Sequence, residues 1–113
     1  MRIRILPSAK RDLHRGFRLY EHQENGIGSY FLDSLYSDIE SICLFAGIHR
    51  RVGELFRFKS KRFPFWVYYR VEVDTAYVVA VLDARQAPWK VRRRERIEQS
   101  DPPNEDSAGA PSS

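Results

Sequence analysis

The stretch SKRFPFWVYYRVE, residues 60–72, decides the fold because its side chains alternate with a period of two. The apolar set of this alternation consists of Phe65, Val67, Tyr69, Val71 and Val73. The other set consists of Trp66, Tyr68, Arg70 and Glu72. Because successive side chains of a strand point to opposite faces, the pattern predicts a strand with one buried face. Its other face carries aromatic rings together with charges.

Two more stretches with this period flank the first one, at residues 54–59 and 76–82. We expect Asp74 and Thr75 to form the tight turn before the last strand. Nearer the N-terminus, residues 2–6 alternate and predict a short strand that stops before Pro7. Together with the helices described next, these strands predict an α+β fold with the order β-α-α-β-β-β, in which a helical hairpin packs on one face of an antiparallel sheet.

The two helices follow from apolar positions that recur every three or four residues. The first helix runs from Ser8, which we expect to cap it, to about Tyr20. The residues around Gly26 and Gly28 then break the pattern. The second helix carries a wide apolar stripe and ends at Gly47. A short loop between two helices favours an antiparallel helical hairpin.

A chain of 113 residues is expected to form one domain. We place this domain at residues 1–98 and expect residues 99–113, rich in Asp, Pro, Ser and Gly, to be disordered. The chain has 19 basic and 15 acidic side chains, and three of the acids lie in the last 13 residues. The folded part is therefore the basic part. This surplus indicates an anionic or acidic partner, although many basic proteins bind no nucleic acid.

We expect a cytoplasmic location. The single cysteine, Cys43, cannot form an internal disulfide, the N-terminus does not resemble a signal peptide, and no apolar run is long enough to span a bilayer. No membrane partner is expected.

Several chemistries lack the residues they need. The three histidines are not at metal-ligand spacing, and Gly26 and Gly28 lack the lysine of a phosphate-binding loop. Cys43 stands among apolar residues, so we interpret it as a small core residue rather than a nucleophile. We therefore expect no metal and no cofactor.

The sheet face away from the helices is the candidate site. If residues 55–59 alternate, Arg57 and Lys59 project together, and Tyr68 and Arg70 do likewise on the next strand. Arg85 and further arginines follow the last strand and would gather on the same uncovered face. Cations mixed with rings suit phosphate contact and base stacking. They equally suit an acidic peptide, or a face that is merely solvated.

Three segments carry a family resemblance: ILPSAKRDL, KRFPFWVYYRVE and AVLDARQAPW. In this order they resemble toxins of the RelE/ParE superfamily, the toxic halves of bacterial type II toxin–antitoxin pairs. The resemblance covers about residues 2–94. It implies the β-α-α-β-β-β architecture that the periodicities predict independently. It also implies a partner, a cognate antitoxin protein.

The resemblance leaves two activities open. RelE-like members cut messenger RNA on the ribosome without a metal, whereas ParE-like members inhibit DNA gyrase. Arg57 and Lys59 match the basic pair of the RelE-like members, and Arg85 can stand for the arginine after their last strand. Trp66 stands where those members have an arginine.

The position of a C-terminal proton-transfer residue holds Trp89 or Lys90. An indole cannot act as a general acid or base. We therefore favour a ParE-like toxin that acts by binding, with the ribosome-dependent endoribonuclease as the alternative. A titratable side chain beside the basic pair would weaken this choice.

Two sets of candidate residues result. The target-binding candidates are Arg57, Lys59, Lys61, Arg62, Tyr68, Arg70, Arg85, Trp89, Arg92 and Arg93. The antitoxin-binding candidates are Phe31, Leu32, Leu35 and Tyr36, because the apolar stripe of the second helix is wider than the sheet needs. Most of that stripe could equally be ordinary core.

Overall fold

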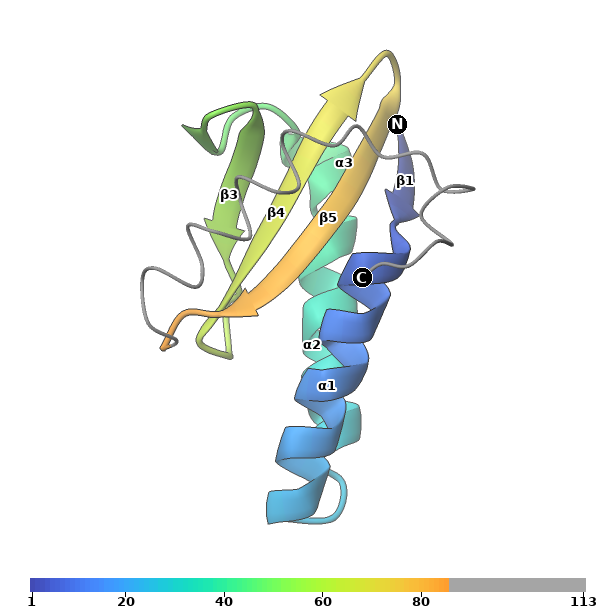
Figure 1. Cartoon of the computed structure of the whole chain (residues 1–113). Coiled ribbons are helices and arrows are strands. Elements are labelled where there is room, and N and C mark those ends of the chain that lie inside the picture. The colour runs from blue at the N-terminus through green and yellow to red at the C-terminus, as the bar shows by residue number, and fades with distance from the viewer. Residues whose placement is uncertain (86–113) are drawn as a thin grey trace.

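The computed structural model describes residues 1–85 and shows two helices packed behind a twisted sheet (Figure 1). The elements in chain order are β1 (Arg2–Ile5), α1 (Pro7–Gln23), α2 (Ile27–Glu40), α3 (Ile42–Phe45), β2 (Arg50–Val52), β3 (Leu55–Lys59), β4 (Phe65–Glu72) and β5 (Thr75–Asp83). The α+β class, the helical hairpin and the element order are as predicted, with two short elements added, α3 and β2. None of the helices within residues 1–85 is long and apolar enough to cross a membrane.

The sheet has five strands in the order β1-β5-β4-β3-β2. Strands β2 to β5 pair antiparallel, but β1 pairs parallel with β5. The prediction of a wholly antiparallel sheet is therefore wrong for β1, because a period of two says nothing about the direction of a neighbouring strand. The prediction also missed β2. It joins β3 through Gly53 and Glu54, and Gly53 has a φ of 65° that suits a two-residue hairpin turn.

The helical hairpin depends on a close approach between α1 and α2. Gly16 of α1 lies directly against Phe31 of α2, and a Cβ atom at Gly16 would overlap the phenyl ring. The second helix is shorter than predicted. It ends at Glu40, where the Ser41 hydroxyl donates a hydrogen bond to the Asp38 carbonyl. A hydroxyl that bonds back to the preceding turn commonly bends or ends a helix.

Helix α1 is tied to β5 at a β-bulge. Tyr68 pairs with Ala80 and Tyr69 with Val78, so Val79 is the extra residue of β5. Ser8 does not cap the helix as predicted, because its Oγ donates to the Val79 carbonyl at 2.7 Å. The buried Asp12 carboxylate accepts a hydrogen bond from the Val81 N–H at 2.9 Å. Two side chains of one helix face thus satisfy the backbone groups that the bulge leaves unpaired.

The main core lies between the helices and the sheet. The side chains of Phe65, Val67, Tyr69 and Val71 in β4 face the helices, which confirms the predicted alternation. At one end of this core Tyr20, Phe31 and Phe65 form a cluster of rings with centroids 4.9–6.2 Å apart. Rings at these separations add to the stability gained from burial.

Two predicted core residues are at the surface. Val73 is 99% exposed and has a φ of 57°, because it forms the β4–β5 turn together with Asp74. The turn therefore begins one residue earlier than predicted. Cys43 is also exposed, on α3, and is not a core residue. The apolar neighbours of Cys43 misled the prediction, because α3 is a short segment in which only Ile42 is buried.

Candidate interaction surface on the sheet

The sheet face opposite α1 and α2 gathers cations from four strands. The strand register places six of them on this face: Arg2, Arg4, Arg50, Arg57, Lys59 and Arg70. We call these residues the basic face. Glu72 is the single carboxylate that the strands contribute to it within the described residues. Figure 1 views the molecule from this side, with α2 and α3 behind the sheet.

The predicted grouping of Arg57, Lys59 and Arg70 on one face is confirmed by the register. Arg57 pairs with Tyr68, and Lys59 pairs with Trp66. Paired residues on neighbouring strands point to the same side of a sheet. A slip of one residue would have separated these groups, and the alternation of β3 and β4 prevents it.

The arginines of the basic face rest on aromatic rings. The Arg57 guanidinium lies 4.1 Å from the centroid of the Trp66 ring, and that of Arg70 lies 4.4 Å from the Tyr77 ring. Such stacks hold a cation in place by attraction to the ring face. A planar guanidinium can stack on a ring and donate hydrogen bonds from its edge at the same time.

An apolar cluster occupies the centre of the same face. It consists of the buried residues Leu6, Leu55, Tyr68, Val79, Ala80 and Leu82, with Trp66 and Tyr77 packed against it. Tyr68 points to the predicted side but has no accessible surface. It therefore belongs to this second core and is not an exposed ring for stacking against a partner. The prediction of an uncovered polar face missed this cluster, because the bulge in β5 turns the side chains of Ala80 and Leu82 toward this face.

Titratable groups do lie beside the cations, contrary to the expectation that there would be none. The Glu72 carboxylate is 3.0 Å from Arg70 Nε and is 57% exposed. The Tyr77 hydroxyl belongs to the ring beneath Arg70. Neither group is a histidine, the side chain that ordinarily exchanges protons near neutral pH. A carboxylate can accept a proton, so Glu72 is the candidate base on this face.

Three other target-binding candidates lie elsewhere. Lys61 and Arg62 are exposed in the connection between β3 and β4, at the end of the sheet. Arg85 is directed toward the helix side, so its predicted place on the basic face is wrong. Its guanidinium donates to the Asp83 carboxylate and, at 3.3 Å, to the Tyr20 hydroxyl of α1.

Asp83 and Arg85 form a tight local pair. Partial burial would raise the pKa of Asp83, but the hydrogen bonds and charge of Arg85 outweigh burial and hold this pKa below its usual value. The remaining candidates Trp89, Arg92 and Arg93, and the expected tail, lie outside the described residues.

The antitoxin-binding candidates separate into two kinds. Phe31 and Leu35 are fully buried in the main core, so they are not available as a docking surface, and Leu32 is half-buried against that core. Only Tyr36 is exposed. The stripe was wide because α2 packs on both α1 and the sheet, which requires apolar residues over a broader arc.

Sequence reasoning missed three cations of the basic face. Arg2 and Arg4 alternate with Ile3 and Ile5, so the sequence indicated that the two arginines share one side of β1. The pairing of β1 with β5 places that side on the basic face. Arg50 could be found only by recognising β2. It stands directly opposite Arg57, and like charges in that position destabilise a strand pair.

Comparisons with known proteins give a likeness of fold. No protein-family model matches the chain, and no curated protein sequence matches it significantly. Among solved structures, the chain is similar to one described as "Chromosomal ParDE TA system from P. aeruginosa", with a TM-score of 0.69 and 13% sequence identity. The match covers 75% of this chain and 97% of the other chain. The architecture of residues 1–85 is therefore a RelE/ParE-like fold.

Proposed function

We propose that this protein is the toxin of a type II toxin–antitoxin pair and that it acts by binding its target, in the manner of ParE. The fold is like that of a chain from a ParDE system. The observation that carries the proposal is the basic face, where six cations from four strands surround an apolar centre with one carboxylate among them. Such a surface favours a large anionic or acidic target.

The same face supports binding better than catalysis. Within residues 1–85 its only strand-borne carboxylate, Glu72, is paired with Arg70, and none of its strand residues is a histidine. A missing acid–base group lowers the rate of a typical enzyme by about 10² to 10⁴. Arg70 Nη1 is buried and forms no hydrogen bond in the described part of the chain. We infer that the target is DNA gyrase, in the cytoplasm.

A supercoiling assay with purified gyrase tests this proposal, run beside a cleavage assay on ribosome-bound messenger RNA. We expect inhibition of gyrase by the full chain and no cleavage of the message. The double variant Arg57→Gln and Arg70→Gln should weaken inhibition at least tenfold, or about 1.4 kcal/mol of binding free energy. Arg51→Gln is the matched control, because Arg51 is one strand away but stacks on Phe56 on the helix side. Untouched gyrase at high toxin concentration would contradict the proposal.

The alternative function is a RelE-like endoribonuclease, and Glu72 is the observation that favours it. Its carboxylate lies 3.0 Å from Arg70 Nε, on the same face as Arg57 and Lys59, where it could accept a proton near a phosphate held by Arg70. Glu72→Gln separates the two functions. A nuclease should lose about 10² to 10⁴ in cleavage rate, whereas a binding toxin should keep its growth arrest.

The proposal includes a cognate antitoxin. Tyr36 remains a candidate contact, and three large apolar side chains, Leu44, Phe45 and Ile48, are exposed shortly after it in the chain. Exposed apolar side chains that lie together are typical of protein interfaces. Co-purification with the product of a neighbouring small reading frame tests this point. Leu44→Glu should weaken the complex. Glu40→Gln, at an exposed position between Tyr36 and Leu44 in the chain, should not.

A further inference from the structure

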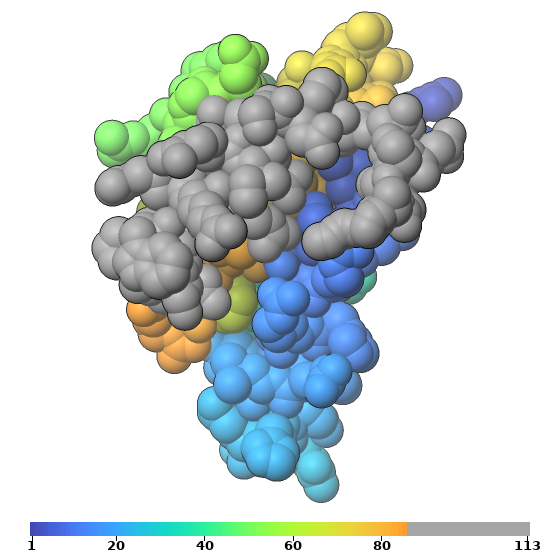
Figure 2. Space-filling model, viewed as in Figure 1, coloured from blue at the N-terminus to red at the C-terminus, as the bar shows by residue number. Residues whose placement is uncertain are grey.

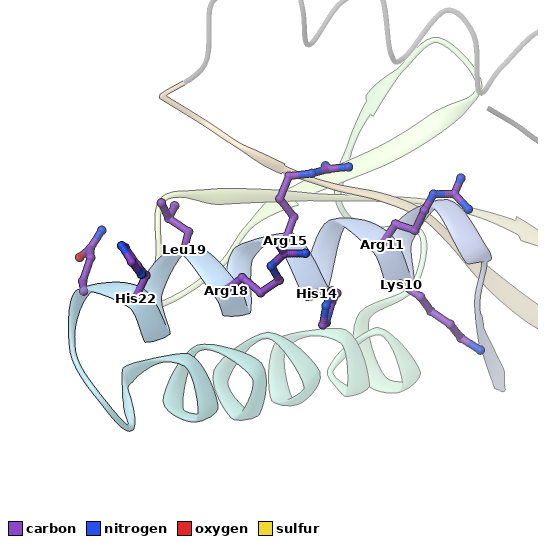
Figure 3. Close-up of a pocket in the computed structure, with 8 residues that line it drawn as sticks. Lys10, Arg11, His14, Arg15, Arg18, Leu19 and His22 are labelled. Atoms are coloured by element: carbon purple, nitrogen blue, oxygen red, sulfur yellow. The ribbon is translucent and has the colours of Figure 1, made fainter.

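The outer surface of α1 carries a second group of cations that the proposed function does not use. Eight residues line a shallow depression along this helix: Lys10, Arg11, His14, Arg15, Arg18, Leu19, His22 and Gln23. We call the Lys, Arg and His residues of this set the α1 stripe. Figure 3 shows Arg11 and Arg15 rising from one side of the helix, Lys10 pointing to another side, and Arg18 lying along the helix.

The two acidic residues of α1, Asp12 and Glu21, bond mainly elsewhere, and only Asp12 reaches a cation of the stripe. Asp12 is buried and accepts its hydrogen bond from β5. Glu21 bends back over the loop to α2, where it accepts from the backbone N–H groups of Gly26 and Gly28 at 2.9–3.1 Å. Within residues 1–85, Lys10, Arg11 and Arg18 form no ion pair, and Arg15, which pairs with Asp12, keeps 69% of its side chain exposed.

This arrangement is unfavourable for an isolated helix. Arg11 and Arg15 stand four residues apart, and like charges at this spacing repel each other. Moreover, the first turn of α1 contains no acidic residue, and Lys10 and Arg11 lie near the positive end of the helix dipole. An anion bound along the helix would offset both effects.

We propose that the α1 stripe binds the phosphate backbone of a nucleic acid, as an activity of the chain that requires neither an antitoxin nor the proposed target. From Lys10 to His22 the stripe runs for about 18 Å at the rise of an α-helix. Three of its four permanent cations are arginines, which match phosphate geometry through two parallel donors. The stripe can therefore contact several successive phosphates of one strand.

A protein partner fits the stripe less well. Protein interfaces usually contain a buried apolar centre with few charges, yet Leu19 is the only large apolar side chain that lines the α1 depression. Nucleic-acid interfaces are instead polar and strongly positive. The chemistry of the lining residues therefore favours phosphate over an acidic protein.

The stripe is continuous with the basic face of the sheet. Arg4 of the basic face and Lys10 of the stripe line one depression, together with Ile3, Ile5 and Pro7. In the view of Figure 2, α1 forms the lower part of the molecule, on the side from which the sheet is seen in Figure 1. A nucleic acid along α1 can thus extend toward the sheet edge at β1.

The test is the salt dependence of binding by the purified full chain, with a fluorescent duplex DNA and a single-stranded RNA of equal length. We compare the wild type with the triple variant Lys10→Gln, Arg11→Gln and Arg18→Gln, in which glutamine preserves helix propensity. Each lost phosphate contact should reduce the slope of log K against log salt by about 0.9 on duplex or 0.7 on single strands. The variant should therefore show a slope shallower by about 2 to 3 units and at least about tenfold weaker binding at low salt.

Two controls keep the outcome interpretable. The charge-preserving variant Lys10→Arg, Arg11→Lys and Arg18→Lys should bind with the wild-type slope, and circular dichroism should show equal helix content in all three proteins. An unchanged slope in the glutamine variant would overturn the proposal. So would equal affinity for polyglutamate or for anionic lipid vesicles, because neither offers a nucleic-acid backbone. The tighter binding of the two at equal salt identifies the preferred nucleic acid. Both measurements test α1 without gyrase or ribosomes present.

Discussion

The two faces of the sheet use the same strands for different purposes. Toward the helices, Phe65, Val67 and Tyr69 of β4 enter a closed core in which the rings of Tyr20 and Phe31 pack together. Toward the other side, β4 contributes Trp66, Tyr68 and Arg70 to an apolar centre bordered by cations. One face therefore provides stability, and the other combines some stability with a surface for binding.

Polar groups are satisfied differently on the two sides. On the helix side, Ser60 donates to the Asp38 carboxylate at 2.5 Å, and both residues are buried. On the basic face, the guanidinium groups of Arg57 and Arg70 lie over rings at 4.1–4.4 Å. Buried polar groups with fixed partners make a structure rigid, whereas cations over rings remain able to exchange partners.

The largest expected effect is on the helix side. Phe31→Ala removes a fully buried ring that contacts Gly16, Tyr20 and Phe65. We expect the free energy of unfolding to fall by about 3–5 kcal/mol, because the cavity cannot be refilled between two helices and a sheet. Urea denaturation measures this change. A loss below about 1 kcal/mol would show that the helix side of the sheet is not the more tightly packed of the two faces.

A smaller effect is expected where α1 joins the bulge. Asp12→Ala leaves the Val81 N–H buried without its acceptor, which should cost about 1–3 kcal/mol. Asn is the informative second variant, since its amide oxygen can still accept this bond. We expect Asp12→Asn to lose less than Asp12→Ala in thermal denaturation, and equal losses would contradict the assigned hydrogen bond.

The helix side also predicts a pH effect. The Tyr69 hydroxyl accepts from the Gly47 N–H at 3.1 Å and, as we assign it, donates to His49 Nδ1 at 2.5 Å. Burial disfavours the imidazolium and lowers the pKa of His49, and burial also raises the pKa of Tyr69. In the unfolded chain, the His49 imidazole therefore takes up a proton near the ordinary histidine pKa of about 6.5. In the folded chain it does so only at lower pH.

Stability from His49 is consequently present above a pH of about 6.5 and is lost as the pH falls toward the lower folded pKa. Urea denaturation at pH values from about 7.5 down to 5 should show this loss. His49→Gln should remove this part of the pH dependence, and His22→Gln, at an exposed position, should leave it in place. A pH profile unchanged by His49→Gln would contradict the assignment.

The smallest effect on stability is expected on the basic face. Lys59 is exposed on β3, so Lys59→Gln should change the free energy of unfolding by no more than about 0.5 kcal/mol. The same variant should weaken binding to an anionic target, because one cation of the face is lost. Denaturation together with the supercoiling assay measures both. A large loss of stability with unchanged binding would reverse the assignment of the two faces.

Local periodicity determined most of the secondary structure. The alternation in β4 and the three-to-four spacing in α1 and α2 place apolar side chains on one face of each element. This pattern can be identified from the order of the residues alone. The common face of Arg57, Lys59 and Arg70 could be predicted for the same reason. The turn signal Gly53-Glu54 was also present, and recognising it would have revealed β2 and Arg50.

The tertiary structure alone decided the features that depend on contacts distant in sequence. The parallel pairing of β1, the bulge at Val79 and the burial of Tyr68 arise where α1 bonds to β5, about 70 residues further along the chain. Likewise, Arg85 turns toward Tyr20 because Asp83 and α1 provide its partners. Periodicity records which side of one element is apolar, whereas strand order, bulges and ion pairs depend on which elements meet.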